Sequence, residues 1–165
     1  MVVFKSVIKI FIELGILNQS KSGKLIDIGS GDGKEAALFQ GNGFEVTLID
    51  LKNGIDATTY LYPKEEYDIA IARNSLPFMK DKQFDVINNI YKTLKTGGYF
   101  YGTVFGSEDP WAKEELITPI NFQELTTFLN KLNFKIIWQS EEKGIDKTMK
   151  GDLKDWHVFK FLVRK

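Results

Sequence analysis

The sequence predicts an α/β protein: an open, mostly parallel, twisted sheet with helices on both faces and a C-terminal antiparallel β-hairpin. Strand-like and helix-like segments alternate along most of the 165 residues, a pattern typical of parallel sheets. The segment 67–72, YDIAIA, is apolar almost throughout, which suits a strand covered on both faces. The last two strand-like segments, 134–140 and 156–165, have only the polar stretch 141–155 between them. Without a crossover helix they are expected to pair antiparallel.

The first expected element is an amphipathic helix over residues 2–17. Lysine and glutamate interrupt this apolar stretch, so it is not a membrane span, and it lacks the small-residue cleavage site of a signal peptide. Its apolar residues recur at three- and four-residue steps, as on one face of a helix, at Val3, Val7, Ile10, Leu14 and Leu17.

The elements that follow are bounded by turn residues. In the first half we expect strands over 24–28, 44–50 and 67–72, and a helix over 34–40 that the GNG tripeptide stops. In the second half, apolar residues spaced as on a helix face begin after Asp81, and the TGG tripeptide at 96–98 is expected to end that helix. A strand over 99–105 follows. Asn121 and Glu124 resemble a capping box at the start of the next helix.

Length and composition limit the class of protein. A chain of 165 residues is expected to form one domain, 1–165. The formal net charge of zero does not favour nucleic acid or an anionic membrane as partner. The absence of cysteine excludes disulfides, thiolate zinc sites and cysteine nucleophiles, and suits the cytoplasm. With His157 as the single histidine, no metal site is expected. The sequence leaves the oligomeric state open.

Three glycines, Gly29, Gly31 and Gly33, stand where a strand should meet a helix. Such a loop lets a ligand lie against bare backbone at the carboxyl end of the sheet, although a tight turn without a ligand is the alternative. The P-loop pattern fails because Glu35 follows the Gly-Lys pair. The dinucleotide pattern G-x-G-x-x-G fails because its last position is Lys34.

The pattern D-x-G-x-G-x-G over residues 27–33 resembles the first motif of class I S-adenosylmethionine-dependent methyltransferases. YDIAIARNSLPFM and LKTGGYFYGTVF are similar to the later strands and Gly turn of that family, so the resemblance runs from Leu25 to Val163. FGSEDPWA and DWHVF are similar to segments of small stand-alone bacterial members. Only seventeen residues separate Asp50 from Asp68, where many members fit a helix and a strand. This edge of the sheet is therefore expected to be trimmed or irregular.

The resemblance implies S-adenosylmethionine as cofactor, with methyl transfer by in-line displacement. It places the methionine moiety on the backbone of the glycine loop, its amino group near Asp27, the ribose on Asp50, and the adenine beside the residues that follow. Arg73 and Asn74 fall where cofactor and substrate meet. The expected cofactor-binding residues are Asp27, Gly29, Ser30, Gly31, Asp50, Leu51, Asp56, Ala57, Arg73 and Asn74.

The acceptor is expected to be a small, neutral molecule bound over the fourth and fifth strands of the family. Aromatic residues suit such a pocket, and the candidates are Phe78, Phe105, Trp111 and His157. His157 is also the candidate general base, because its ordinary pKa lies near neutrality. Pro77 stands where related members often carry a histidine. The polar stretch 141–155 is interpreted as a loop that closes over the substrate.

Two other functions compete with methyl transfer. One is a non-catalytic protein of the same fold that holds S-adenosylmethionine or S-adenosylhomocysteine. The other is a nicotinamide-dependent enzyme with a degenerate glycine loop.

Overall fold

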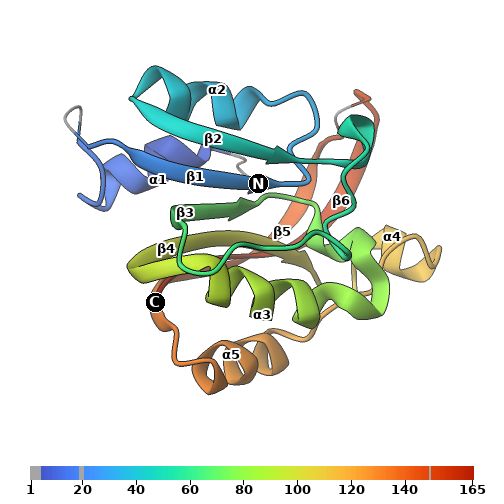
Figure 1. Cartoon of the computed structure of the whole chain (residues 1–165). Helices are drawn as coiled ribbons and strands as arrows, with labels where there is room; N and C mark the ends of the chain where they lie inside the picture. Colours follow the sequence, from blue (N-terminus) through green and yellow to red (C-terminus); the bar gives the residue numbers. More distant parts are fainter. Residues whose placement is uncertain (1–4, 19–20, 149) are drawn as a thin grey trace.

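The computed structural model describes residues 5–18, 21–148 and 150–165, and in it six strands form one mixed sheet in the order β2-β1-β3-β4-β6-β5 (Figure 1). Helices lie on both faces of this sheet, as the sequence predicts. The elements in chain order are α1 Val7–Glu13, β1 Gly23–Ile28, α2 Lys34–Gly41, β2 Phe44–Ile49, η1 Leu51–Asn53, β3 Tyr67–Ala72, η2 Leu76–Lys82, α3 Gln83–Thr93, β4 Leu94–Phe105, α4 Pro110–Lys113, α5 Phe122–Lys131, β5 Lys135–Lys147 and β6 Leu153–Arg164.

The sheet is parallel over β2, β1, β3 and β4, and antiparallel where β6 pairs with β4 and β5. The register pairs Ile28 with Ile49, so the loops after β1 and β2 leave the sheet side by side. Phe105 at the end of β4 lies opposite Val158 of β6. The predicted parallel sheet and C-terminal hairpin are therefore confirmed.

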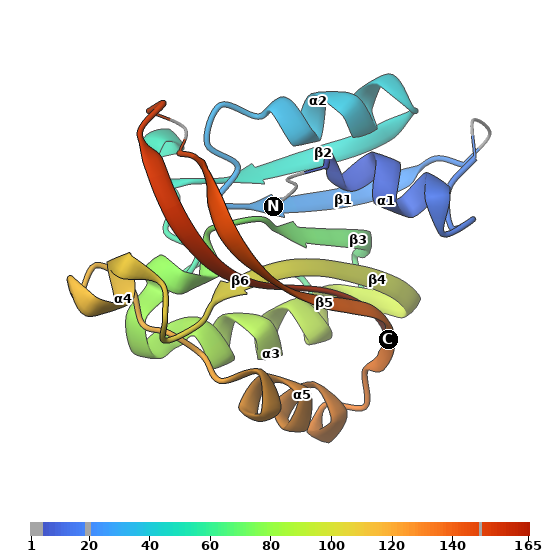
Figure 2. The ribbon, with the colours of Figure 1, turned by 180° about the vertical axis from the view of Figure 1, so that it is seen from behind.

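Each face of the sheet carries its own apolar core. Val86 and Ile87 of α3 and Leu125 of α5 pack with strand residues such as Phe100 on one face. Phe11 of α1 and Phe39 of α2 pack on the other, with the two rings 5.9 Å apart edge to face. Figure 2 shows α1 and α2 together on the side turned away in Figure 1. The sheet is thus the middle layer of three.

The N-terminal helix is shorter than the predicted span 2–17. It covers Val7–Glu13, while Val3 and the rest of 2–4 lie outside the described residues. Gly15 takes a φ of +68° and ends the helical path. Of the predicted apolar residues beyond Glu13, Leu17 is buried although it lies outside the helix, whereas Leu14 is 41% exposed, contrary to the prediction. No helix among the described residues is long and apolar enough to cross a membrane.

The prediction of a loop over 141–155 is wrong. β5 continues to Lys147 and β6 begins at Leu153, and they pair without a break from Ile145–Asp155 to Lys147–Leu153. Polar residues are tolerated there because β5 is an edge strand whose alternate residues face solvent. β6 pairs with β4 only as far as Val158, so the hairpin projects beyond the end of β4 as a two-stranded ribbon.

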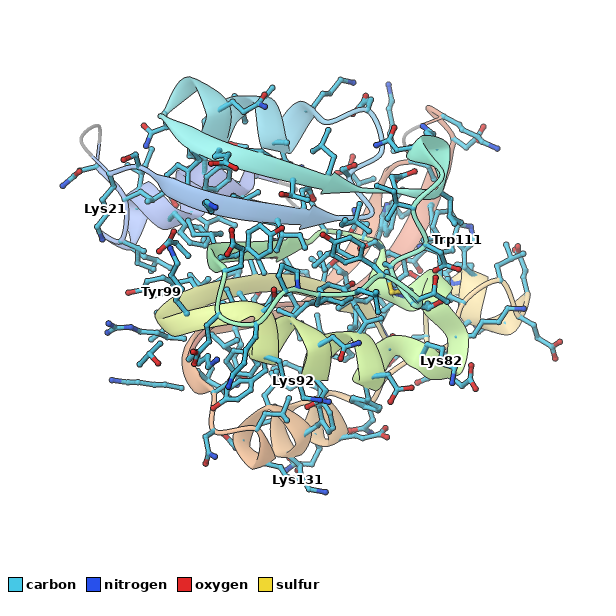
Figure 3. The ribbon with its side chains drawn as sticks, in the orientation of Figure 1. Lys21, Lys82, Lys92, Tyr99, Trp111 and Lys131 are labelled. Carbon is cyan, nitrogen blue, oxygen red and sulfur yellow. The ribbon has the colours of Figure 1, made fainter. Side chains whose placement is uncertain are left out.

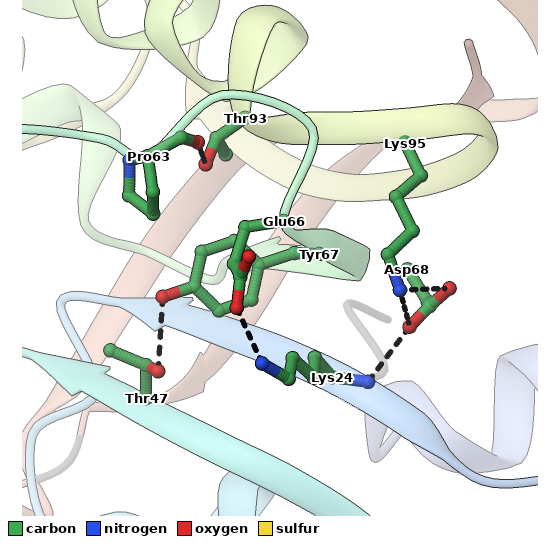
Figure 4. A network of polar contacts seen from close by, with 8 residues as sticks. All are labelled: Lys24, Thr47, Pro63, Glu66, Tyr67, Asp68, Thr93 and Lys95. Carbon is green, nitrogen blue, oxygen red and sulfur yellow. Dashed lines mark hydrogen bonds and ion pairs between the residues drawn. The ribbon is translucent and has the colours of Figure 1, made fainter.

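The trimmed edge predicted between β2 and β3 is confirmed. Residues 51–66 contain one short helix, η1, and no strand. Ile55, Tyr60 and Tyr62 of this segment pack against the core on the α3 side of the sheet. Its last residues reach the amino ends of β1 and β3, where polar contacts hold the chain (Figure 4). Lys24 Nζ pairs with Glu66 at 2.5 Å, the Lys24 N–H donates to Asp68 at 2.8 Å, and the Tyr67 hydroxyl contacts Thr47 at 3.1 Å. The opposite end of the sheet is left for the glycine loop.

Candidate cofactor and acceptor site

The glycine loop and Asp50 meet at the carboxyl ends of β1 and β2. The Gly29 N–H donates to the Ile49 carbonyl at 2.7 Å. The Gly31 N–H donates to Asp50 Oδ2 at 2.8 Å, and the Lys52 N–H donates to Asp50 Oδ1 at 2.8 Å. Each carboxylate oxygen keeps a further lone pair for a ligand. Asp50 therefore fixes both loops and still presents an acceptor between them.

The glycines serve different purposes in this loop. Gly29 has a φ of +73°, and a Cβ there would lie 2.1 Å from the Cβ of Ser75. Ser75 is itself held by a hydrogen bond from its hydroxyl to the Ile28 carbonyl at 2.6 Å. Gly31 has a φ of +56°, and a Cβ there would meet nothing within 4 Å. Gly29 lets the loops after β1 and β3 touch, whereas Gly31 faces open space.

A pocket of about 500 Å³ opens beside these loops, a size typical of small-ligand sites. Of the predicted cofactor and substrate residues, it brings together Gly29, Asp50, Leu51, Asp56, Ala57, Asn74 and Phe78. Its wall also contains residues that sequence reasoning missed, namely Ile49, Ile55, Thr58, Ser75, Met79, Lys80, Asp81 and Lys82.

Four predicted cofactor residues lie beside this pocket rather than in its wall, namely Asp27, Ser30, Gly31 and Arg73. Ser30 follows Gly29, and its buried hydroxyl has no hydrogen-bond partner among the described residues. Asp27 is buried on β1 beneath the loop. Arg73 forms an ion pair with Glu35 of α2, and Glu35 also accepts the Val7 N–H at 2.9 Å. Arg73 and Glu35 thus link the loop after β3 to α1 and α2.

The carboxyl groups beneath the loop crowd one another. Burial, together with the nearby charges of Glu35 and Asp50, raises the pKa of Asp27 to about 7, and Arg73 opposes this shift. Such a group suits a positively charged ligand, because a nearby cation would favour its ionised form. It disfavours a phosphate.

The pocket and its surroundings fit S-adenosylmethionine. That cofactor carries a positively charged sulfonium, an ammonium group and no phosphate. These charges match the carboxyl groups of Asp27, Glu35 and Asp50 beneath the loop. Asp50 offers acceptor oxygens for ribose hydroxyls, and Ile49, Ile55 and Ala57 supply apolar wall for a ring. The Ser30 hydroxyl, which has no hydrogen-bond partner in the described part of the chain, and the open space at Gly31 could accommodate a polar group of the ligand beside the glycine loop.

The predicted acceptor residues separate into two groups. Phe78, half exposed at 49%, lies 5.7 Å from Trp111 and 6.4 Å from Phe105, measured between ring centroids. Trp111 also contacts Trp156 at 5.5 Å. Figure 3 shows Trp111 and Lys82 on the side of the molecule where β2 ends, and Tyr99 and Lys21 on the opposite side.

His157 does not join this aromatic group, contrary to the prediction that gathered all four residues. Successive residues of a strand face opposite sides, so Trp156 faces Trp111 while His157 packs on Phe159 at 4.9 Å. His157 lines a separate pocket of about 460 Å³ beside the start of α5. Its Nδ1 accepts the Glu108 N–H at 3.2 Å, so its Nε2 carries the proton and faces Glu141 at 2.9 Å.

Two aspartates fix turns near the site, and the sequence predicted only Asp56 of the two. Asp109 precedes Pro110 and Trp111, and its carboxylate accepts the Trp111 N–H at 3.0 Å as the N-cap of α4, a recognisable capping pattern. Asp56 accepts the Thr58 N–H and hydroxyl, each at 2.8 Å, which lowers the pKa of Asp56.

Among the residues that the structure describes, no group of acidic or histidine side chains is arranged to hold a metal.

A family model described as a methyltransferase domain matches residues 4–140. No protein with a curated description matches the sequence.

Several solved structures share the fold. A SAM-dependent methyltransferase from Methanosarcina mazei has a TM-score of 0.73 at 17% identity, over 93% of this chain and 96% of that one. TehB from Haemophilus influenzae has a TM-score of 0.74 at 16% identity, over 99% and 62%. The 1,6-didemethyltoxoflavin-N1-methyltransferase of Burkholderia thailandensis, solved with 1,6-didemethyltoxoflavin and S-adenosylhomocysteine, has a TM-score of 0.68 at 20% identity, over 96% and 75%.

Proposed function

The chain belongs to the methyltransferase-domain family and is a methyltransferase with S-adenosylmethionine as its cofactor, and from this premise we propose that it methylates a small molecule. The observation that carries the proposal is the 500 Å³ pocket between the glycine loop and Asp50, whose wall includes Phe78, a ring that contacts Phe105 and Trp111. The Burkholderia neighbour, solved with a small heterocycle, supports an acceptor of this size. In this proposal residues 1–165 act as one domain.

The chain's residues hold the cofactor through three features. The backbone of Gly29 and Gly31 and the Ser30 hydroxyl contact the methionine moiety, and Asp27 attracts its ammonium group. Asp50 accepts the ribose hydroxyls, since its two oxygens already point between the loops. Leu51, Asp56 and Ala57 border the adenine, and Arg73 acts indirectly by holding Glu35.

S-adenosylmethionine, when bound, supplies a methyl group on a sulfonium that leaves as a neutral thioether. The chain has to hold the acceptor in line and at near-attack distance. Asn74 and Phe78 both line the pocket, and the Phe78 ring contacts Trp111. Asn74 is fixed there because Thr103 holds both its N–H, at 2.6 Å, and its side-chain carbonyl, at 2.9 Å.

We assign His157 a positioning role in place of the general base that the sequence suggests. Both of its ring nitrogens have partners, the Glu108 N–H and the Glu141 carboxylate. A Cβ on Gly106 would lie 2.3 Å from the imidazole, so the ring packs directly on the chain that leaves β4. His157 thereby orients residues 106–109, which lead to Trp111.

The setting proposed for this reaction is the cytoplasm, with a small molecule rather than nucleic acid as partner. The absence of cysteine and the zero net charge support both statements.

Calorimetry and a turnover assay test the proposal. S-adenosylmethionine and S-adenosylhomocysteine should bind, while NAD and ATP should not. Gly31→Val should remove binding, because its side chain fills the open space beside the loop and its φ of +56° strains the loop backbone. The chain should stay folded, because the added Cβ meets no other part of the protein within 4 Å. Release of S-adenosylhomocysteine in a screen of small acceptors should then identify the substrate. Cofactor binding without turnover on any acceptor would instead support a non-catalytic binding protein, and normal affinity in a folded Gly31→Val variant would remove the loop from the site.

A further inference from the structure

A lysine ammonium lies inside a cage of aromatic rings next to the proposed site. Lys154 Nζ is 3.6 Å from the ring centroid of Trp156, 4.1 Å from that of Trp111 and 4.9 Å from that of Phe105. Asp109 completes the cage, with its Oδ2 2.5 Å from Nζ. The Lys154 side chain is 4% exposed and the Asp109 side chain is not exposed.

Each wall of the cage is fixed independently of the lysine. Asp109 accepts the Trp111 N–H at 3.0 Å and the His157 N–H at 3.3 Å. The Trp156 indole N–H donates to the Asp146 carbonyl at 3.2 Å. Phe105 is fully buried. The cage is therefore preformed, and removing the ammonium would leave a buried carboxylate facing three rings.

The cage adjoins the pocket through one ring. Phe78 lines the 500 Å³ pocket and contacts Trp111 at 5.7 Å and Phe105 at 6.4 Å. A small molecule whose reactive end lies in the pocket near Asn74 would extend past Phe78 toward the cage.

We propose that the cage of Phe105, Trp111, Trp156 and Asp109 binds an alkylammonium group of the methyl acceptor, and that Lys154 fills the cage until that group replaces it. The proposal rests on methyl transfer as the function, and it names the acceptor class as cationic, where the sequence indicated a neutral molecule. Aromatic walls with a carboxylate are the usual recognition site for quaternary and methylated ammonium groups.

The charge of the bound nitrogen determines whether that atom can be methylated. A protonated or quaternary nitrogen has no free lone pair, so the cage anchors the acceptor and the methylated atom lies elsewhere in the molecule.

Lys154 can reach solvent by a short movement, because it is the second residue of β6 and its neighbour Leu153 is 73% exposed. Burial lowers the pKa of the Lys154 ammonium, so the cost of removing the charge from water offsets part of its attraction to Asp109 and the rings.

The first test uses tetramethylammonium as probe and tryptophan fluorescence as readout, because Trp111 and Trp156 both line the cage. Lys154→Ala removes the tethered competitor, whose effective concentration is on the order of millimolar or more. Tetramethylammonium should bind this variant at least about tenfold more tightly than the wild type. 3,3-Dimethylbutanol, whose tert-butyl group has nearly the shape of tetramethylammonium but no charge, should not bind. Lys143→Ala, which removes an exposed lysine of the same hairpin, should behave as the wild type.

The second test needs no substitution and covers the case in which Lys154→Ala does not fold. Acetylation of the wild type, followed by peptide mass spectrometry, reports the accessibility of each lysine. Tetramethylammonium should raise acetylation of Lys154 severalfold, because the displaced amine enters solvent. Acetylation of Lys143 should not change, and 3,3-dimethylbutanol should have no effect on either.

The proposal is overturned if Lys154 stays protected at tetramethylammonium concentrations at which the fluorescence of the wild type shows that the cage is occupied, or if 3,3-dimethylbutanol has the same effect as the cation. It is also overturned if folded Lys154→Ala shows no saturable binding. None of these measurements uses the cofactor. If the cage does not bind tetramethylammonium, the protein can still be a methyltransferase that acts on another class of acceptor. If S-adenosylmethionine does not bind, the proposed function itself is wrong.

Discussion

Asp27 should make the stability of the protein fall as the pH rises from about 4 to about 7. Its side chain is buried, and burial together with Glu35 and Asp50 raises its pKa to about 7. In the unfolded chain the same carboxyl titrates near about 4. Between these two values the unfolded chain has released the proton and the folded chain has kept it, so the free energy of unfolding decreases with pH.

The magnitude follows from the two pKa values. A separation of about 3 units at about 1.4 kcal/mol per unit gives a loss of about 4 kcal/mol between about pH 4 and pH 7. Asp27→Asn cannot ionise and lacks this loss. The difference in free energy of unfolding between Asp27→Asn and the wild type should therefore grow with pH over this range and level off above about pH 7.

Urea unfolding at a series of pH values measures that difference. Asp32→Asn is the matched control, because Asp32 lies in the same loop but pairs with Lys34 at the surface. A constant steric penalty of the asparagine would shift the Asp27→Asn curve without changing its pH dependence. If the difference between Asp27→Asn and the wild type is the same at every pH, the reasoning about the buried carboxyl is refuted.

The remaining predictions concern the loop, the ribose contact, the acceptor side and cofactor affinity. Gly29→Ala should lower the free energy of unfolding by about 2–4 kcal/mol in chemical denaturation, since its Cβ would lie 2.1 Å from that of Ser75. Adding Ser75→Gly should recover part of this loss. If the losses of the two single variants simply add in the double variant, the Gly29–Ser75 contact is not the cause. Asp50→Asn should weaken S-adenosylmethionine binding by about 1.5–3 kcal/mol in calorimetry, and unchanged affinity would leave Asp50 as a loop support only. Trp111→Ala should lower turnover while sparing cofactor affinity, and full turnover would move the acceptor elsewhere. In the wild type, cofactor affinity should fall close to tenfold per unit as the pH drops below about 7, whereas in Asp27→Asn it should stay level across the same calorimetric series.

Sequence patterns predicted the elements that local chemistry determines. The glycine loop and Asp50 could be placed together because parallel strands deliver their carboxyl ends to one edge of the sheet, and the register of Ile28 with Ile49 does so. The short span between Asp50 and Asp68 predicted the trimmed edge, because chain length alone excludes a further helix and strand.

What the sequence did not reveal depends on which face a strand residue occupies and on contacts distant along the chain. His157 and Trp111 were predicted to share a site, yet strand alternation turns His157 toward Phe159. Lys154 and Asp109 are 45 residues apart, and no local pattern joins them. The stretch 141–155 lacks an apolar run because an edge strand needs only one covered face, so its polarity was misinterpreted as a loop.

The long edge strand β5 has a consequence for how the molecule meets its own copies. The outer edge of β5 presents unpaired N–H and C=O groups along thirteen residues, which in principle invites a strand from another chain. Alternate side chains face solvent there, and those at Lys135, Glu141, Lys143 and Lys147 carry charge. A second copy added in register would bring like charges opposite one another, so the edge is protected against self-association into extended sheets.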